Sequence, residues 1–224
     1  MKNNKKYSSF LTCLPRVGKR GAMIGAALFA TATVQAQSSS QAQNPSPPAA
    51  SSEAASSISH RGKEFLKEAS QANQTEISMA NVAESKSANT QVKDLARMMR
   101  TEHEQNYAQV QTLAQAHGVK LDTAPDWMNQ HEINHLQKAN DADFDKEYTK
   151  IMIKDHVKCI VRFEKAAADL EEQDIKQYAQ NTLPALQHHL QKSEDAARSA
   201  GVDQATIDSL LKDLPNGDRT VTSR

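Results

Sequence analysis

Met99-Arg100-Thr101-Glu102-His103 and Met152-Ile153-Lys154-Asp155-His156 share the pattern Met-x-x-acid-His. Each copy lies near the middle of a long segment in which apolar residues recur at helical spacing. A histidine is stable on the apolar face of a packed helix only where other groups satisfy its ring nitrogens. The two copies therefore indicate two long helices that bring polar groups into a shared interior.

Two further segments have the same periodicity. Apolar residues recur at steps of three and four over residues 62–86, 90–117, 143–172 and 174–200, as in helices that face a common core. Gly118 follows the second of these helices, in the position where glycine commonly ends a helix. The low glycine count of 7 and the aromatic content of 4% also favour helices over sheets.

The connection over residues 118–142 is much longer than the other two. Pro125 opens a short helical piece within it. A helix of about 27 residues is about 40 Å long, and a connection of this length can return along it. The sequence therefore predicts an all-α fold, a ferritin-like four-helix bundle with a long crossover between helices two and three, which then run parallel.

The N-terminal region predicts export. Residues 1–36 begin with a basic stretch, continue into an apolar and small-residue segment, and end in Val34-Gln35-Ala36, as a signal peptide does. The apolar segment 21–36 is too short to cross a bilayer, so no transmembrane span is expected in the mature chain. The predicted location is periplasmic or otherwise exported, with association with the outer membrane left open.

Composition divides the remaining chain. Residues 37–60 are rich in Ser, Gln, Ala and Pro, and predict a disordered linker. The helical bundle is expected over 61–201, and 202–224 form a C-terminal tail. Six of the 27 Lys and Arg residues lie within 1–36 and all 27 acidic residues follow it, so the mature chain has a formal charge of −6. This charge argues against nucleic-acid binding and leaves an envelope protein or a second copy as a partner.

Each predicted helix carries one ionisable residue in its apolar stripe: Glu76, His103, His156 and His189. All four lie about 13 to 15 residues from the predicted helix start, so an antiparallel arrangement brings them to one level. One carboxylate and three imidazoles suit a transition metal such as zinc, iron, manganese or copper. These four residues are the candidate metal ligands.

Neighbouring residues extend this hypothesis and also supply an alternative. Glu102 and Asp155 precede two of the histidines, and are candidates for further ligands or for groups that orient the imidazoles. Met79, Met99 and Met152 are expected one turn to the same side of the polar level, where thioethers suit copper(I) or simply fill gaps in the core. The alternative is a metal-free network in which one carboxylate satisfies three histidines and fixes helix register.

Several motifs resemble a bacterial family of exported, ferritin-like proteins of unknown function that are often described as outer membrane proteins. The resemblance covers roughly residues 61–200. The motifs are Glu76, Met-x-x-Glu-His at 99–103, Phe144-Asp145-x-x-Tyr148, Met-x-x-Asp-His at 152–156, and Leu183-Pro184-x-x-x-His188-His189-Leu190. The resemblance implies a ferritin-like bundle in the cell envelope and no particular activity.

Three classes of function remain open from the sequence. The first is a metal-binding or stress-related envelope protein, the second a metal-dependent redox or hydrolytic enzyme, and the third a metal-free structural or interaction module. The Glu-x-x-His pairs of di-iron carboxylate proteins do not occur on the four long predicted helices, which argues against a di-iron oxidase. Whether the protein is an enzyme stays undecided because no motif names a substrate.

Overall fold

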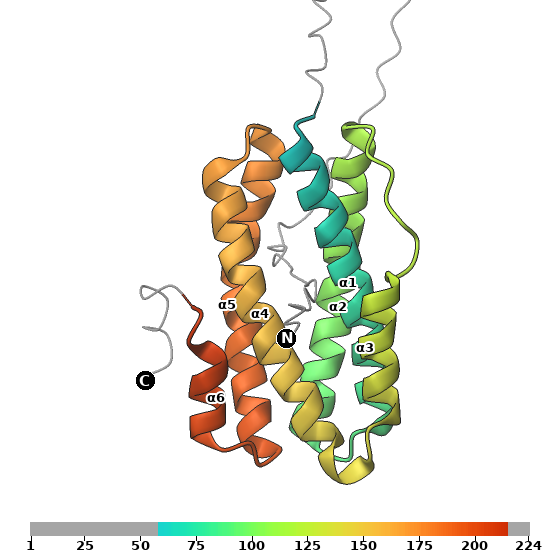
Figure 1. The fold of residues 1–224 in the computed structure, drawn as a ribbon, viewed down its shortest axis with the longest axis vertical. Helices are drawn as coiled ribbons and strands as arrows, with labels where there is room; N and C mark the ends of the chain where they lie inside the picture. The colour runs from blue at the N-terminus through green and yellow to red at the C-terminus, as the bar shows by residue number, and fades with distance from the viewer. Residues whose placement is uncertain (1–57, 215–224) are drawn as a thin grey trace, which may run out of the picture. The chain divides into compact units, whose positions relative to one another are not determined.

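Residues 58–214 of the computed structural model fold into helices joined by turns and loops, and no strand occurs among them (Figure 1). The helices are α1 (His60–Lys86), α2 (Thr90–Ala116), α3 (Trp127–Lys138), α4 (Asp141–Asp169), α5 (Gln173–Ser199) and α6 (Gln204–Leu211). The all-α prediction is confirmed for this part of the chain. The structure describes residues 58–214, so the predicted signal peptide at 1–36, nearly all of the 37–60 linker and the last ten residues of the tail lie outside it.

Local side chains determine where the helices begin and end. The Asn89 side chain accepts hydrogen bonds from two backbone N–H groups in the first turn of α2, at 2.9 and 3.3 Å. Gly118 follows α2 with a φ of 64°, a conformation that favours glycine. Asp126 caps α3 as Asn89 caps α2. α4 ends at Asp169, slightly before the predicted end, because Leu170 is already extended.

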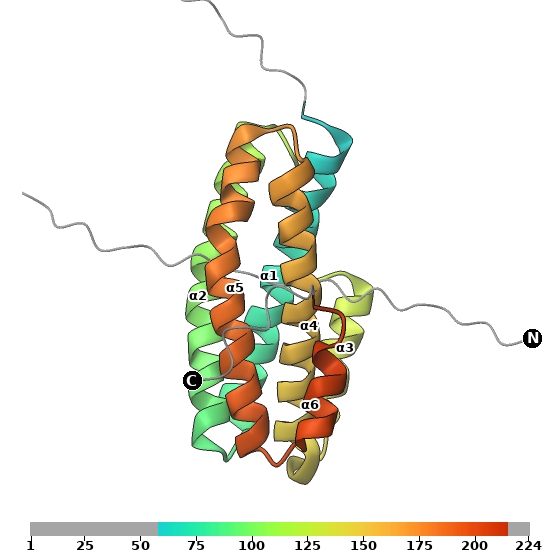
Figure 2. The same ribbon diagram turned by 90° about the vertical axis from the view of Figure 1, so that its left-hand side faces the viewer.

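The four long helices lie side by side and form two hairpins, α1–α2 and α4–α5 (Figures 1 and 2). α1 and α5 run in one direction, while α2 and α4 run in the other (Figure 1). The predicted parallel direction of the second and third long helices is therefore confirmed. The crossover that makes it possible contains α3, which packs alongside α1.

Two glutamines of α1 hold the start of the crossover. The Gln71 amide donates to the Ala124 carbonyl at 3.1 Å, and its oxygen accepts from the Asp126 N–H at 2.7 Å. The Gln74 amide donates to the Asp122 carbonyl at 3.0 Å. These bonds satisfy backbone groups that a loop would otherwise leave to water, and they fix where α3 begins.

The buried apolar residues form two clusters. The first apolar cluster includes three packed rings, Phe65, Phe163 and Tyr178, with Phe65 and Phe163 centroids 4.9 Å apart. The second apolar cluster includes all three methionines singled out from the sequence. These are Met79, Met99 and Met152, and each is fully buried. The three methionines thus lie on one side of the histidines, as the predicted methionine layer requires. This position fits both a metal site and ordinary core packing.

α6 covers one side of the α4–α5 hairpin and buries Ile207 against the first apolar cluster (Figure 2). Part of the predicted C-terminal tail is thus packed on the helices. Within residues 58–214, none of the helices combines the length and hydropathy that a bilayer crossing requires.

Candidate metal centre

Each long helix places one of the predicted site residues in the interior. Glu76 lies on α1, His103 on α2, His156 on α4 and His189 on α5. The three histidines are 0% exposed and Glu76 is 1% exposed. We call these four residues the histidine layer. On α1 and on α2, the residue of the histidine layer lies between residues of the first and of the second apolar cluster. The buried face of each helix is therefore apolar, then polar, then apolar again within a few turns.

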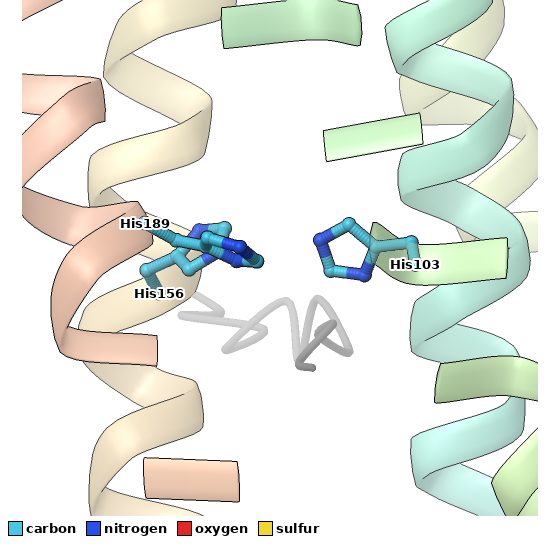
Figure 3. Close-up of side chains that lie close together, drawn as sticks. All are labelled: His103, His156 and His189. Carbon is cyan, nitrogen blue, oxygen red and sulfur yellow. The ribbon is translucent and has the colours of Figure 1, made fainter. Parts of the chain in front are cut away.

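The three imidazoles gather at one point although they come from three helices. Figure 3 shows His156 and His189 together on one side, with a ring nitrogen of His103 directed at them from the other. One ring nitrogen from each histidine lies within 4.8 Å of one from each of the others. The closest pair is His156 Nε2 and His189 Nδ1, 3.3 Å apart. This is a set of donors that can surround a single ion.

Glu76 lies next to these imidazoles at a greater distance. Its Oε2 is 3.9 Å from His103 Nε2, and its Oε1 is 3.9 Å from His156 Nδ1. Both distances exceed a hydrogen bond. Glu76 thus places a buried carboxylate between the two hairpins, beside the group of three nitrogens.

Hydrogen bonds determine which nitrogen of His103 carries the proton. Its Nδ1 is 3.1 Å from the side-chain oxygen of Asn73. The Asn73 amide nitrogen donates to the Ala69 carbonyl at 2.8 Å and to the Asn106 side-chain oxygen at 2.9 Å, which fixes the orientation of the Asn73 amide. The Asn73 oxygen must therefore accept, so His103 Nδ1 donates and Nε2 keeps the lone pair. Tyr178 extends the network by donating to Asn106 at 2.5 Å.

The other two histidines are oriented in a similar way. His156 Nδ1 lies 2.9 Å from the Met152 carbonyl, which can only accept, so Nε2 carries the lone pair. His189 Nε2 lies 3.0 Å from Glu102 Oε2, and an ionised Glu102 makes this nitrogen the donor and leaves the lone pair on Nδ1. The two lone-pair nitrogens are the ones that face each other at 3.3 Å. Only a cation or a shared proton makes that contact favourable.

Burial favours the neutral form of two of the imidazoles, those of His103 and His156. It lowers the pKa of His103 well below the usual value, and the neighbouring His189 and His156 lower it further. Burial also lowers the pKa of His156 to about 3, with His189 adding to the effect and the Met152 carbonyl opposing it. Neutral imidazole is the form that binds a metal, so the electrostatics of the layer suit ligation at neutral pH.

The two acidic residues of the repeated motif have different partners. Glu102 orients an imidazole, as one hypothesis held, although it is His189 rather than the adjacent His103. Asp155 hydrogen-bonds to Lys158 at 3.3 Å, so its observed partner is a lysine. Burial raises the pKa of Asp155 to about 7 although Lys158 opposes the effect.

Sequence reasoning did not identify Asn73 or the Met152 carbonyl as groups that orient the histidines. Asn73 carried one available signal, since it lies one turn before Glu76 and near the apolar stripe of its helix. A main-chain carbonyl has no sequence signal, because every residue has one.

A protein-family model with the description "Domain of unknown function (DUF4142)" matches residues 46–196. This range contains the whole histidine layer. No curated protein and no solved structure matches the chain. The ferritin-like and outer-membrane assignments remain predictions.

Proposed function

Because the chain belongs to the family described as a domain of unknown function (DUF4142), we propose its function from the histidine layer: it binds one first-row transition metal ion through His103, His156 and His189. One observation carries the proposal. Each histidine directs its N–H at an acceptor outside the group, and this leaves three lone pairs that converge. Such outer hydrogen bonds are the usual companions of metal-binding histidines.

The spacing of the nitrogens supports the same conclusion. Zinc–nitrogen bonds of about 2.0–2.1 Å place two tetrahedral ligands about 3.3–3.4 Å apart. The 3.3 Å between His156 Nε2 and His189 Nδ1 agrees with this value. The His103 nitrogen lies within 4.8 Å of the other two, and the Glu76 carboxyl group lies 3.9 Å from His103 Nε2. Zinc, copper and iron all accept imidazole ligands, and a site with an added carboxylate also accommodates manganese.

In this proposal the fold is a ferritin-like four-helix bundle, and the protein acts in the cell envelope in metal binding or protection from stress. The parallel α2 and α4, joined by the crossover, support the ferritin-like assignment. The basic and then apolar start of the sequence supports export. An envelope protein or a second copy remains the expected partner. The proposal includes no reaction.

The metal content of the full-length gene product, purified from cells without an affinity tag or chelator, tests the proposal. We expect about one metal ion per chain, and loss of most of it in His189→Ala. His188→Ala is the matched control because His188 is the exposed neighbour on the same helix. Absence of bound zinc, copper, iron and manganese after growth with each metal would overturn the proposal and favour the metal-free network.

A further inference from the structure

A second histidine motif lies on α3, away from the histidine layer. His131-Glu132-Ile133-Asn134-His135 has the pattern His-Glu-x-x-His, and all five residues lie within this helix. Residues four apart on a helix are neighbours on one face, with Cβ atoms about 5–6 Å apart. Two histidines at this spacing on a helix bind the zinc ion in one class of metalloproteases. The helix that such a pair of ligands requires is therefore present.

Both histidines of the motif border the same cavity. The cavity has a volume of about 500 Å³, and His131, Glu132 and His135 are among the residues that line it. Both histidines are exposed, and the side chain of His135 is 67% exposed. Exposed side chains change rotamer within picoseconds to nanoseconds, so the two imidazoles can turn toward a common point. The cavity leaves room there for water molecules that complete the coordination of a metal ion.

A buried carboxylate oxygen lies beside one of these imidazoles. Oε2 of Glu147, on α4, is 4.0 Å from Nδ1 of His135. This oxygen is buried and has no hydrogen-bond partner within residues 58–214. The distance exceeds a hydrogen bond, and the exposed His135 ring can turn to shorten it. A carboxylate on the Nδ1 side is a usual outer partner of a metal-binding histidine, and it leaves Nε2 for the ion.

The charges in the cavity wall offset each other. Glu132 is negative and Lys154 of α4 is positive, so the wall itself neither attracts nor repels a cation strongly. Among the described residues that line the cavity, the motif supplies both histidines and the one carboxylate, and there is no cysteine. The cavity therefore offers two imidazole ligands, whereas catalytic zinc sites have three protein ligands.

We propose that His131 and His135 bind a second divalent transition metal ion, with water in the remaining coordination positions. Imidazole suits copper and zinc in particular. The proposal includes metal binding and no reaction. It does not depend on the histidine layer, because no residue of that layer lines the cavity.

The α3 site should hold its ion less firmly than the histidine layer does. Two exposed imidazoles and water leave the ion open to exchange with solvent, whereas the three histidines of the layer are 0% exposed. The α3 site should therefore lose its ion during purification and fill again when metal is added.

Trp127 provides a signal for this site. It is the only tryptophan of the chain, it lies four residues before His131 on the same helix, and it lines the same cavity. Copper(II) quenches the fluorescence of a nearby indole, because the excited ring transfers energy or an electron to the ion. Titration of the full-length protein with copper(II) chloride should therefore quench Trp127 emission in a saturable way. Absence of saturable quenching would overturn the proposal.

Variants assign the quenching to the motif. His131→Ala and His135→Ala each leave one imidazole, so we expect the apparent copper(II) affinity to fall about tenfold or more. His60→Ala is the matched control, since it removes another exposed histidine at the start of α1. His189→Ala should retain the quenching because it alters only the histidine layer. Circular dichroism checks that all variants fold.

Two outcomes of this comparison would contradict the α3 site. The first is an equal copper(II) affinity in wild type, His131→Ala and His135→Ala. The second is loss of quenching in His189→Ala, which would assign the signal to an ion in the histidine layer. Failure of the α3 variants to change the affinity would leave the metal content of the layer unaffected, so the two proposals are tested separately.

Discussion

The two hairpins orient their histidines in different ways. In α1–α2, an amide network of Asn73 and Asn106 holds His103, and none of its members changes charge with pH. In α4–α5, His156 is held by a main-chain carbonyl and His189 by Glu102, whose side chain is 30% exposed. One hairpin thus relies on neutral side chains, while the other relies on the backbone and on a carboxylate that reaches solvent.

This difference separates the roles of the two hairpins in the proposed site. The α4–α5 histidines are already 3.3 Å apart, although the Glu102 that orients His189 comes from α2 of the other hairpin. His103 completes the group from the opposite side (Figure 3). Metal binding should therefore depend on both hairpins but respond differently to substitutions in each.

Metal removal should have the largest effect, because the proposed ion would be bound by histidines of both hairpins. At a free metal concentration of about 1,000 times Kd, binding to the folded state alone adds roughly 4 kcal/mol to the free energy of unfolding. We expect chelator to lower the melting temperature of wild type strongly and to leave that of His156→Ala nearly unchanged. Thermal melts with and without chelator measure this. Identical wild-type curves would favour the metal-free alternative.

Acidification of the metal-free protein should have a smaller effect for each pH unit than metal removal has, but the effect should build up over several pH units. The pKa values of His103 and His156 are lowered in the folded state, so the unfolded state takes up protons first. The contribution of these histidines to the free energy of unfolding is then fully present above the ordinary histidine pKa of about 6.5. Below that pH, each of the two histidines lowers the free energy of unfolding by up to about 1.4 kcal/mol per pH unit. For His156 the loss ends near its folded pKa of about 3.

Denaturant unfolding of metal-free protein at several pH values across that window measures the slope. His103→Gln should reduce the slope by removing one titrating group from the α1–α2 side. His188→Ala should leave the slope unchanged because this residue is exposed. A slope that is the same in His103→Gln and wild type would contradict the assignment.

The groups that orient the histidines should have a smaller effect. Asn73→Leu removes the acceptor of His103 Nδ1 and should weaken metal binding by about 10–100-fold. Glu102→Gln keeps an acceptor oxygen near His189 and removes only charge, so we expect a loss at the lower end, about tenfold. Calorimetric titration with zinc compares the two. A larger loss in Glu102→Gln would reverse the proposed difference between the hairpins.

Met152→Leu should have the smallest effect. The group that holds His156 is the main-chain carbonyl, which the substitution retains. A Met-to-Leu exchange in a core generally costs less than about 1.5 kcal/mol. We expect unchanged zinc affinity and a small change in the denaturation midpoint. Selective loss of copper(I) affinity would instead identify the thioether as a ligand.

The helices and their ends could be predicted from the sequence because the signals that determine them are local. Apolar spacing, the Asn89 cap and the glycine at Gly118 each act within a few residues. The level of the histidines was also predictable, since equal distances from helix starts give equal heights in antiparallel helices. Whether a metal binds there stays a prediction, as do the signal peptide and the exported location.

The hydrogen bonds around the histidines were less predictable because they cross between helices. Glu102 precedes His103 in the chain, yet consecutive residues on a helix point in different directions, and its carboxylate meets His189 of α5. Such a partner depends on how helices are rotated against each other, which spacing along one helix does not determine. Asp155 differs, because its partner Lys158 lies three residues further on the same helix, where helical spacing places it.

The crossover between α2 and α4 also has a consequence for the order of folding. Most contacts within each hairpin join helices that are adjacent in the chain, so each hairpin can form early and locally. The histidine layer exists only after the crossover has brought the hairpins together, at an entropic cost that grows slowly with loop length. A chain that is still being made therefore exposes His103 before it has the other two histidines. The three proposed ligands are therefore together only after α5 is in place.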